Sequence, residues 1–378
     1  MASIYIHIPF CKTKCFYCDF YSTVKLSYLT DFTDSLLKEI AIRQKYLSKQ
    51  TISTIYFGGG TPSLLQPYEL QKIIIKIKDV FDIKKDIEIT MEANPEDLTE
   101  KYIAALKNTE INRISVGIQS FEDNILQTLN RRHTAQQAIS AIELLQKHGF
   151  LNISADLIYG IPGLSLQTWE KNLYRFIQLK IPHLSAYHLT YEPHSVFGYY
   201  LKKNKITPLK EKQSAEQYDL LCYIARKNKL FHYEISNFGI QGFISEHNNN
   251  YWNNTNYLGF GPGAHSFNNI ARQWNKPNLF RYISNLKAHK LPPHQQEILS
   301  DTDKFNDYII TRLRTINGIK INEIRRQFPQ FYHHTKKVID LLKTDTLNCK
   351  FEKGKFSLTE KGFFLSDTYM EKFIILAP

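Results

Sequence analysis

Residues 4–18 read IYIHIPFCKTKCFYC and place three cysteines directly after a short apolar run. Isoleucine and aromatic side chains dominate residues 4–10, which predicts a buried β-strand. Cys11, Cys15 and Cys18 follow with the spacing C-x3-C-x2-C. We therefore expect a cysteine-bearing loop at the end of the first strand of the fold.

Three thiolates in one loop indicate a metal centre. Thiolate is a soft ligand that selects iron–sulfur clusters or zinc, and such sites usually take four protein ligands. A four-iron, four-sulfur cluster on these three cysteines would leave one iron open to an exogenous donor. Lys12 and Lys14 would offset part of its negative charge. A zinc ion completed by a distant histidine, or three unliganded thiols, are the alternatives.

Strands and helices alternate from this loop onward. Further strands are predicted at residues 52–57, 87–92, 113–118, 153–159 and 184–190. Helices are predicted between them at residues 27–49, 67–81, 99–107, 135–148 and 166–179. This alternation favours an α/β fold with a parallel sheet. Right-handed crossovers would curl the sheet into a partial (β/α)6 barrel.

Chemically active residues fall where such a barrel places its functional site, at the carboxyl ends of the strands. Cys11 follows the first strand and the glycines 58–60 end the second. Glu92 ends the third strand, Gln119 follows the fourth, and Asp156 lies within the fifth. We expect these residues to face one another at one mouth of the barrel.

The regular alternation stops after residue 190 and suggests three parts. Residues 1–230 are expected to form the barrel. Residues 231–295 are dense in Gly, Asn and aromatic residues and are expected to be a loop-rich segment packed near the site. Residues 296–378 are expected to form a mainly helical, winged-helix-like C-terminal domain, since three helical patterns precede a hairpin around Gly354.

Composition and charge exclude several classes of protein. With 378 residues, 43% hydrophobic and 22% charged, the chain is too long for one small core and has the composition of a globular protein. Its net charge of +12 would suit nucleic acid, an anionic membrane surface or a polyanionic small molecule. There is no run of five basic residues and no nucleic-acid-binding motif, so nucleic acid is not an expected partner.

Cysteine usage and hydropathy indicate the cellular compartment. Five cysteines, three of them clustered, do not resemble a disulfide framework. The N-terminus shows no signal peptide, and no apolar run of 18 residues is present. A reducing, cytoplasmic location is therefore expected.

The chain resembles one branch of a known superfamily over most of its length. C-x3-C-x2-C after a first strand is typical of the radical S-adenosylmethionine (SAM) superfamily. The flanking residues resemble its coproporphyrinogen dehydrogenase-like branch, and within that branch the chain is most similar to HemW-type heme chaperones. The likeness is carried by YIHIPFC, FGGGTPS, EANPE, SVGIQSF, LNRRH, ADLIYGIPG, YEISNF, HNNNYW and YLGFGPGAHS.

The resemblance implies that the open iron of the cluster binds the amino and carboxylate groups of SAM. It places Tyr5 and Tyr17 beside this cofactor, close to the cluster. It places Gly59, Gly60 and Thr61 at the methionine moiety, where glycine lets backbone amides approach a ligand closely.

Further SAM contacts are implied for Glu92, Gln119, Arg131 and Asp156. A guanidinium such as that of Arg131 can bind a carboxylate with two nitrogens. The carboxylates of Glu92 and Asp156 can accept hydrogen bonds from the SAM ammonium group or ribose hydroxyls. Arg132 is an adjacent alternative to Arg131.

Residues 247–252, HNNNYW, match the HNxxYW motif of the heme chaperones. The match implies that His247 is an axial ligand of heme iron, since a neutral imidazole is an ordinary heme ligand. Tyr251 and Trp252 would flank the porphyrin.

Four other candidates are assigned structural roles. His7 and His265 could also ligate heme, but hydrogen-bonded structural roles are favoured for both. Cys222 and Cys349 are expected to be structural, because neither has a metal-ligating neighbour in the sequence.

The resemblance implies a protein that binds heme and delivers it to an acceptor apo-protein, such as a membrane-associated respiratory heme protein. It leaves open a peripheral position at the inner membrane and a homodimer. The dehydrogenases carry a further cysteine where this chain has Phe20, and an N-terminal extension where this chain has four residues before Tyr5. Both differences argue against oxidative decarboxylation of coproporphyrinogen.

Two other functions remain as alternatives. One is an enzyme, either the oxygen-independent coproporphyrinogen III dehydrogenase or a related radical SAM methyltransferase. The other is a tRNA- or membrane-binding protein with a structural cluster, which only the net charge favours.

Overall fold

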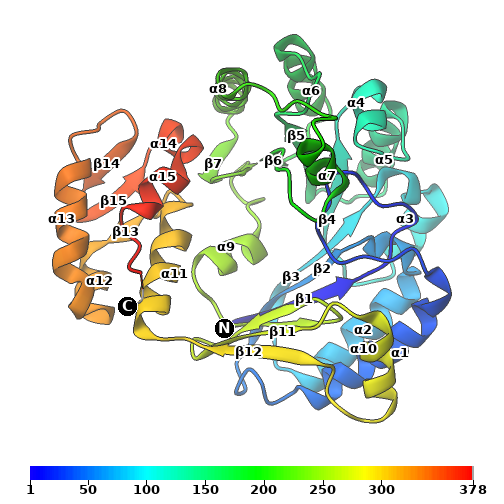
Figure 1. The fold of residues 1–378 in the computed structure, drawn as a ribbon. Helices are drawn as coiled ribbons and strands as arrows, with labels where there is room; N and C mark the ends of the chain where they lie inside the picture. Colours follow the sequence, from blue (N-terminus) through cyan, green and yellow to red (C-terminus); the bar gives the residue numbers. More distant parts are fainter. Residues whose placement is uncertain (377–378) are drawn as a thin grey trace.

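The first half of the chain forms an open α/β barrel in the computed structural model, which describes residues 1–376 (Figure 1). Six parallel strands lie side by side in sequence order. They are β1 Ala2–Ile8, β2 Ile52–Gly59, β3 Ile83–Ala93, β4 Arg113–Gln119, β5 Ile153–Tyr159 and β6 His183–His188. The helices that cover the outside are α1 Leu29–Ile42, α2 Pro67–Val80, α3 Glu100–Leu106, α4 Asp123–Thr128, α5 Ala135–Lys147 and α6 Leu166–Gln178. The predicted partial (β/α)6 barrel is confirmed.

Alternate side chains of each barrel strand serve different purposes. In β1, Ile4, Ile6 and Ile8 are fully buried in the apolar core. Tyr5 and His7 lie on the other face and are hydrogen-bonded to each other. Because a parallel strand covered by helices is buried on both faces, its inner face can carry polar groups only where they find partners. The polar residues of the site lie on this inner face.

The sheet continues past the barrel at both edges into twelve strands, in the order β12-β11-β10-β9-β1-β2-β3-β4-β5-β6-β8-β7. The added elements are β7 Phe231–Glu234, β8 Asn237–Gly239, α9 Glu246–Trp252, β9 Tyr257–Phe260, β10 His265–Phe267, β11 Ala271–Asn275, α10 Leu279–Lys287 and β12 His294–Ile298. Residues 231–295 are thus richer in strands than the expected loop-rich segment. Strands of three to five residues between Gly and Asn are too short to show a period of two.

Some helices differ from the sequence-based expectation. Helix α1 ends at Ile42, well before the predicted end at residue 49, because its apolar spacing stops at Ile40. Two helices after the barrel strands, α7 Val196–Lys202 and α8 Glu211–Lys227, were not predicted. In α8 the signal was present, since the buried residues Tyr218, Leu221 and Cys222 recur at helical spacing.

The C-terminal part is mainly helical with a small antiparallel sheet of order β13-β15-β14, as the winged-helix-like prediction required (Figure 1). Its elements are α11 Asp301–Leu313, β13 Ile319–Lys320, α12 Ile321–Gln327, α13 Tyr332–Leu342, β14 Cys349–Glu352, β15 Lys355–Leu358, α14 Glu360–Phe364 and α15 Ser366–Glu371. Across residues 1–376, no helix has the length and apolar character needed to cross a bilayer.

A buried carboxylate holds α1, α10 and the turn after β9 together. One oxygen of Glu39 accepts hydrogen bonds from Arg43 at 3.3 Å and from the Asn275 amide at 2.8 Å. The other oxygen accepts from the Tyr282 hydroxyl at 2.7 Å and from the Gly261 backbone N–H at 2.8 Å. The Glu39 side chain is 0% exposed and that of Arg43 is 4% exposed. Each carboxylate oxygen of Glu39 therefore accepts two hydrogen bonds from other groups of the protein.

Replacing Glu39 by alanine should destabilise the fold strongly. The change leaves the buried Arg43 guanidinium without its counter-charge, which costs about 3–5 kcal/mol of unfolding free energy. Urea unfolding followed by circular dichroism measures this loss. Asp31→Ala is the matched control, because it breaks an exposed ion pair with Lys287 that also links α1 to α10, at a cost of about 0–1 kcal/mol. Equal losses in the two variants would contradict the role of the buried network.

Candidate functional site

The three cysteines lie in a loop that is closed at its base by backbone hydrogen bonds. The Cys11 N–H donates to the Thr23 carbonyl at 3.0 Å, and the Thr23 N–H donates to the Pro9 carbonyl at 2.7 Å. Cys11, Cys15 and Cys18 are free thiols and are partly buried. The sequence prediction of a cysteine loop directly after β1 is confirmed.

Helix α7 supports this loop from outside the barrel. The Phe197 N–H donates to the Phe16 carbonyl at 2.9 Å, between Cys15 and Cys18. The Phe16 ring contacts the rings of Phe197 and Tyr200 edge-on. The loop is therefore held by a helix that the sequence pattern did not predict.

The thiols are positioned by hydrogen bonds from the barrel. Arg131 Nη1 lies 3.4 Å from the Cys15 sulfur, and the Thr61 hydroxyl lies 3.5 Å from the Cys11 sulfur. Burial raises the pKa of the Cys18 thiol to about 11 and also raises that of Cys11. Without a bound cation these two thiols stay protonated at neutral pH, whereas a metal would bind them as thiolates.

Lys12 does not face the thiols as expected. Its ammonium group donates to the carboxylate of Asp97 at 2.9 Å. Lys14 is the basic neighbour whose charge acts on the Cys18 thiol. Of the two lysines, only Lys14 is therefore placed to offset negative charge at the thiols. Arg131 is a further cation that contacts the Cys15 sulfur directly.

Arg131 connects the cysteine loop to two barrel strands. Its Nη2 donates to the Asn94 side chain at 2.7 Å and to the Gly117 carbonyl at 2.6 Å. Its Nε is buried and has no hydrogen-bond partner among the described residues. The neighbouring Arg132 instead pairs with Glu96, away from the cysteine sulfurs that Arg131 contacts.

Gly59 and Gly60 let the end of β2 touch the start of the cysteine loop. Gly59 has φ +105°, and a Cβ there would lie 2.5 Å from the His7 ring. A Cβ on Gly60 would lie 2.6 Å from the Phe10 carbonyl oxygen. Both glycines are needed for this close approach, in addition to any contact with a ligand.

Two buried carboxylates, Glu92 and Asp156, lie close enough inside the barrel for the charge of Asp156 to act on Glu92. Glu92 accepts hydrogen bonds from the Tyr56 hydroxyl at 2.8 Å and the Gly59 N–H at 3.2 Å, and Asp156 accepts one from Ser115 at 3.1 Å. Burial raises the pKa of Glu92 to about 7, and the charge of Asp156 adds to this effect. Burial likewise raises the pKa of Asp156 to about 6. Two buried carboxylates without an ion-pair partner among the described residues are suited to a cationic or hydroxyl-bearing ligand.

The remaining residues predicted to contact SAM lie around the same mouth. Gln119 ends β4 with φ +66° and is buried. Burial raises the pKa of the Tyr17 phenol, which lies near Arg131 and Cys15. Tyr5 lies on the inner face of β1, and its hydroxyl is 3.2 Å from His7 Nδ1.

His247 lies at the opposite mouth of the barrel. Its Nδ1 is 2.7 Å from the hydroxyl of Thr54, near the start of β2, and α9 lies on the side where the barrel strands begin (Figure 1). Residues 246–247 are held by the Glu88 carboxylate, which accepts their backbone N–H groups. The HNNNYW helix thus lies at the end of the barrel away from the cysteine loop, although His247 stacks on Tyr56, whose hydroxyl donates to Glu92. The turn around Gly261 and Gly263 meets the cysteine-loop end of the barrel against His7 and Tyr21, and the Leu279 N–H at the start of α10 donates to the Tyr21 hydroxyl.

The imidazole of His247 is neutral and has one nitrogen free. The Thr54 hydroxyl donates to Ser3, so it accepts a hydrogen from His247 Nδ1. His247 Nε2 is buried and finds no hydrogen-bond partner within residues 1–376. Burial lowers the pKa of His247 to about 3, and the side chain is about 1% exposed.

The other two histidine candidates differ from His247. His7 uses both nitrogens, Nδ1 with the Tyr5 hydroxyl and Nε2 with the Tyr21 carbonyl at 2.8 Å, so it fits a structural role. His265 is exposed and stacks on Trp274 with ring centroids 5.8 Å apart.

A column of aromatic rings runs through the barrel from one mouth to the other. Successive ring centroids lie between 4.8 and 6.5 Å apart. In order from α9 to the cysteine loop the rings are Tyr251, His247, Tyr56, Tyr5, His7 and Tyr21. Sequence reasoning missed Tyr56 and Asn94, although Tyr56 lies in β2 close to Gly58 and Asn94 directly follows β3, close to Glu92, and both of these neighbours had been singled out.

Comparison with known proteins places the chain in a family. The Radical SAM superfamily pattern matches residues 5–173. The chain is similar to the heme chaperone HemW of Lactococcus lactis, with 33% identity over 99% of this chain and 97% of the relative. The chain is also similar to the heme chaperone HemW of Bacillus subtilis, with 31% identity over 97% of this chain and 95% of the relative.

A solved structure shares the fold across nearly the whole chain. It is the coproporphyrinogen III oxidase HemN from Escherichia coli, a radical SAM enzyme, with a TM-score of 0.83 over 98% of this chain and 89% of that chain. At 21% identity this likeness concerns the fold alone. The barrel and its cysteine loop define a radical SAM protein. The chain belongs to the HemW heme chaperone family of that superfamily.

The Glu92 carboxyl should titrate near pH 7, far above an ordinary glutamate. Tyr56→Phe should raise its pKa further, because the lost hydroxyl stabilises the charged form. Carbon-13 NMR of the labelled glutamate carboxyl, assigned with Glu92→Gln, measures the titration. Tyr102→Phe is the control, since that hydroxyl donates to the Leu65 carbonyl. A Glu92 pKa near 4 in the unmodified protein would contradict the arrangement.

Proposed function

We propose that this chain binds heme and delivers it to an acceptor heme apo-protein, and that it carries a four-iron, four-sulfur cluster and SAM in its barrel. The observation that carries the proposal is the match of nearly the full chain to proteins named heme chaperone HemW. Phe20 supports delivery over porphyrinogen decarboxylation, because its side chain offers no thiol where the dehydrogenases have one, and it is 65% exposed.

Cys11, Cys15 and Cys18 would hold the cluster. Three thiols on one supported loop fit a soft metal centre. Bound together, the cluster and SAM supply one-electron chemistry at the SAM sulfonium. The protein's part is to orient the cofactor and exclude water from it.

The groups proposed to bind SAM are matched in charge to its parts. The unpartnered Nε of Arg131, next to Cys15, would donate to the carboxylate. Glu92 and Asp156 would accept from the ammonium group and ribose hydroxyls. The other proposed contacts are Tyr5, Tyr17, Gly59, Gly60, Thr61 and Gln119.

His247 is the proposed axial ligand of the heme iron. A neutral imidazole with Nδ1 hydrogen-bonded and Nε2 free is the form that binds a metal. A buried nitrogen left unpaired costs about 1–3 kcal/mol, which iron ligation would relieve. Because the ring is about 1% exposed, heme can reach Nε2 only when α9 moves away from the barrel.

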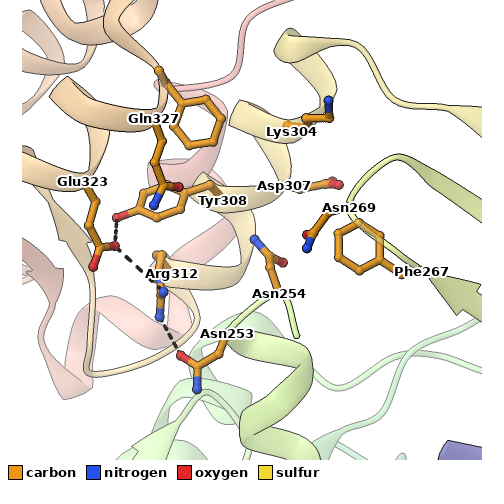
Figure 2. A pocket seen from close by; sticks show the side chains of 11 residues that line it. Asn253, Asn254, Phe267, Asn269, Lys304, Asp307, Tyr308, Arg312, Glu323 and Gln327 are labelled. Carbon is orange, nitrogen blue, oxygen red and sulfur yellow. Dashed lines mark hydrogen bonds and ion pairs between the residues drawn. The ribbon is translucent and has the colours of Figure 1, made fainter. Parts of the chain in front are cut away.

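A hollow beside α9 gives the helix room to move. The cavity of about 350 Å³ lies between the C-terminal end of α9 and the C-terminal domain, and Figure 2 shows its lining side chains. The Arg312 guanidinium donates to the Asn253 side chain at 2.6 Å across this gap. Lys304 and Arg312 on this wall would attract the heme propionates. The net charge of +12 would favour an acidic acceptor or an anionic membrane face.

SAM affinity should fall as the pH is lowered from 8 to 6. Protonation of Glu92, with its pKa of about 7, removes a charge that the ligand needs, which predicts about a tenfold loss. Calorimetric titration of the anaerobically reconstituted protein measures it. Glu92→Gln should flatten the dependence, whereas Glu96→Gln should keep it, because the neighbouring His133 lowers the pKa of Glu96 to about 2. A full pH dependence in Glu92→Gln would rule out this role.

Heme should bind at about one per chain, and His247→Ala should weaken binding at least about tenfold through loss of the axial ligand. Anaerobic titration of the cluster-loaded protein, followed at the Soret band, measures both. His183→Ala is the matched control, because His183 is equally buried but both its nitrogens are bonded, to Ser154 and Tyr233.

Asn253→Ala, which frees α9 from Arg312, should speed heme binding.

The heme titrations distinguish His247 from His265 as the iron ligand and test whether the chain binds heme at all. Loss of binding in His265→Ala but not in His247→Ala would move the ligand to the exposed histidine. Absence of saturable binding in the unmodified protein would refute the heme chaperone proposal.

A further inference from the structure

Cys222, His232 and Glu360 converge where the barrel meets the C-terminal domain. Cys222 lies on α8, His232 on β7, and Glu360 begins α14. One ligand atom from each side chain lies within 4.8 Å of the other two. We propose that these three side chains bind a zinc ion, at a site separate from the cysteine loop.

The His232 ring presents a free nitrogen to this site. Its Nε2 lies 3.4 Å from the Ile235 carbonyl, which fixes the hydrogen on Nε2. Its Nδ1 is buried without a hydrogen-bond partner in the described part of the chain, and the side chain is 7% exposed. A metal-binding histidine commonly donates its second nitrogen to a backbone carbonyl in this way.

The carboxylate of Glu360 faces the same point. Its Oε2 lies 3.8 Å from His232 Nδ1, too far for a hydrogen bond. Its Oε1 is paired with the guanidinium of Arg226, which is 71% exposed. A neutral imidazole nitrogen and a carboxylate oxygen at this distance can share a cation, and Arg226 occupies the other oxygen only.

Cys222 supplies the soft ligand. The residue is buried at 3% exposure, and its sulfur lies within 4.8 Å of the ligand atoms of His232 and Glu360. The Tyr218 hydroxyl donates to the Glu360 carbonyl at 2.7 Å and holds the start of α14 over α8. The three ligands are therefore positioned by the fold before any ion arrives.

The site has an entry path and room for a fourth ligand. A hollow of about 350 Å³ is lined by Cys222, Glu360, Tyr218 and Arg226. One sulfur, one nitrogen and one oxygen, completed by water, make a four-coordinate set that suits zinc. Thiolate makes magnesium or calcium poor occupants.

Sequence reasoning assigned Cys222 a structural role because it searched for ligands nearby in the sequence. Glu360 comes from the other domain, far along the chain. A bound ion here would fasten α14 to α8 and β7, and so tie the C-terminal domain to the barrel edge.

The test uses the full chain with its cluster loaded, so that Cys11, Cys15 and Cys18 are occupied. The protein is titrated with Zn²⁺, desalted, and analysed for zinc and iron by mass spectrometry. About one zinc per chain is expected in the unmodified protein, and at least about a fivefold lower content in Cys222→Ser and in His232→Ala at unchanged iron content. Cys349→Ser is the matched control, because Cys349 is also buried and lies outside the site.

X-ray absorption at the zinc edge identifies the ligands. One sulfur at about 2.3 Å with nitrogen and oxygen neighbours is expected. Three sulfurs would place the zinc in the cysteine loop and overturn the proposal. Equal zinc content in Cys222→Ser and the unmodified protein, or zinc that desalting removes from both, would also overturn it. Unchanged iron content guards against misfolding of the variants.

Discussion

The guanidinium of Arg131 is the contact on which the arrangement of the site depends. It reaches the Cys15 sulfur, the Asn94 side chain after β3 and the Gly117 carbonyl on β4. A loop of eight residues with three thiols has no core of its own, so its position must be set by contacts with the barrel. Arg131 supplies them from one side and Phe197 of α7 from the other. Because a guanidinium keeps its charge in burial, it also compensates the thiolates that a metal centre requires.

The two ends of the barrel carry different chemistry. At the carboxyl ends of the strands lie the thiols, the close-packed glycines and the carboxylates of Glu92 and Asp156. At the other end α9 closes the barrel, with His247 inserted above Thr54 and the Glu88 carboxylate capping the helix. On the proposed function, this separation would let one chain hold SAM and heme without direct contact between them.

Local sequence patterns predicted the structural features that are set by residues close together in the chain. The six barrel strands, the cysteine loop and the glycines at the end of β2 follow from apolar runs, spacing and turn residues. The position of the HNNNYW helix did not follow, because it depends on pairing between His247 and Thr54, which are far apart in sequence. Cys222 and Glu360 meet only because α8 and α14 pack together. Helix α8 is different, because its buried residues recur at helical spacing in the sequence and would have predicted the helix.

The ring column gives the two ends of the barrel a common mechanical element. Tyr56 is stacked against His247 on one side, and its hydroxyl steadies the charge of Glu92 on the other. A ligand that drew His247 out of its place would leave Tyr56 unsupported and would change the acidity of a carboxyl group at the far mouth. Ligand binding at His247 would thus change the protonation of Glu92, and the charge of that carboxyl would report whether the ligand is bound.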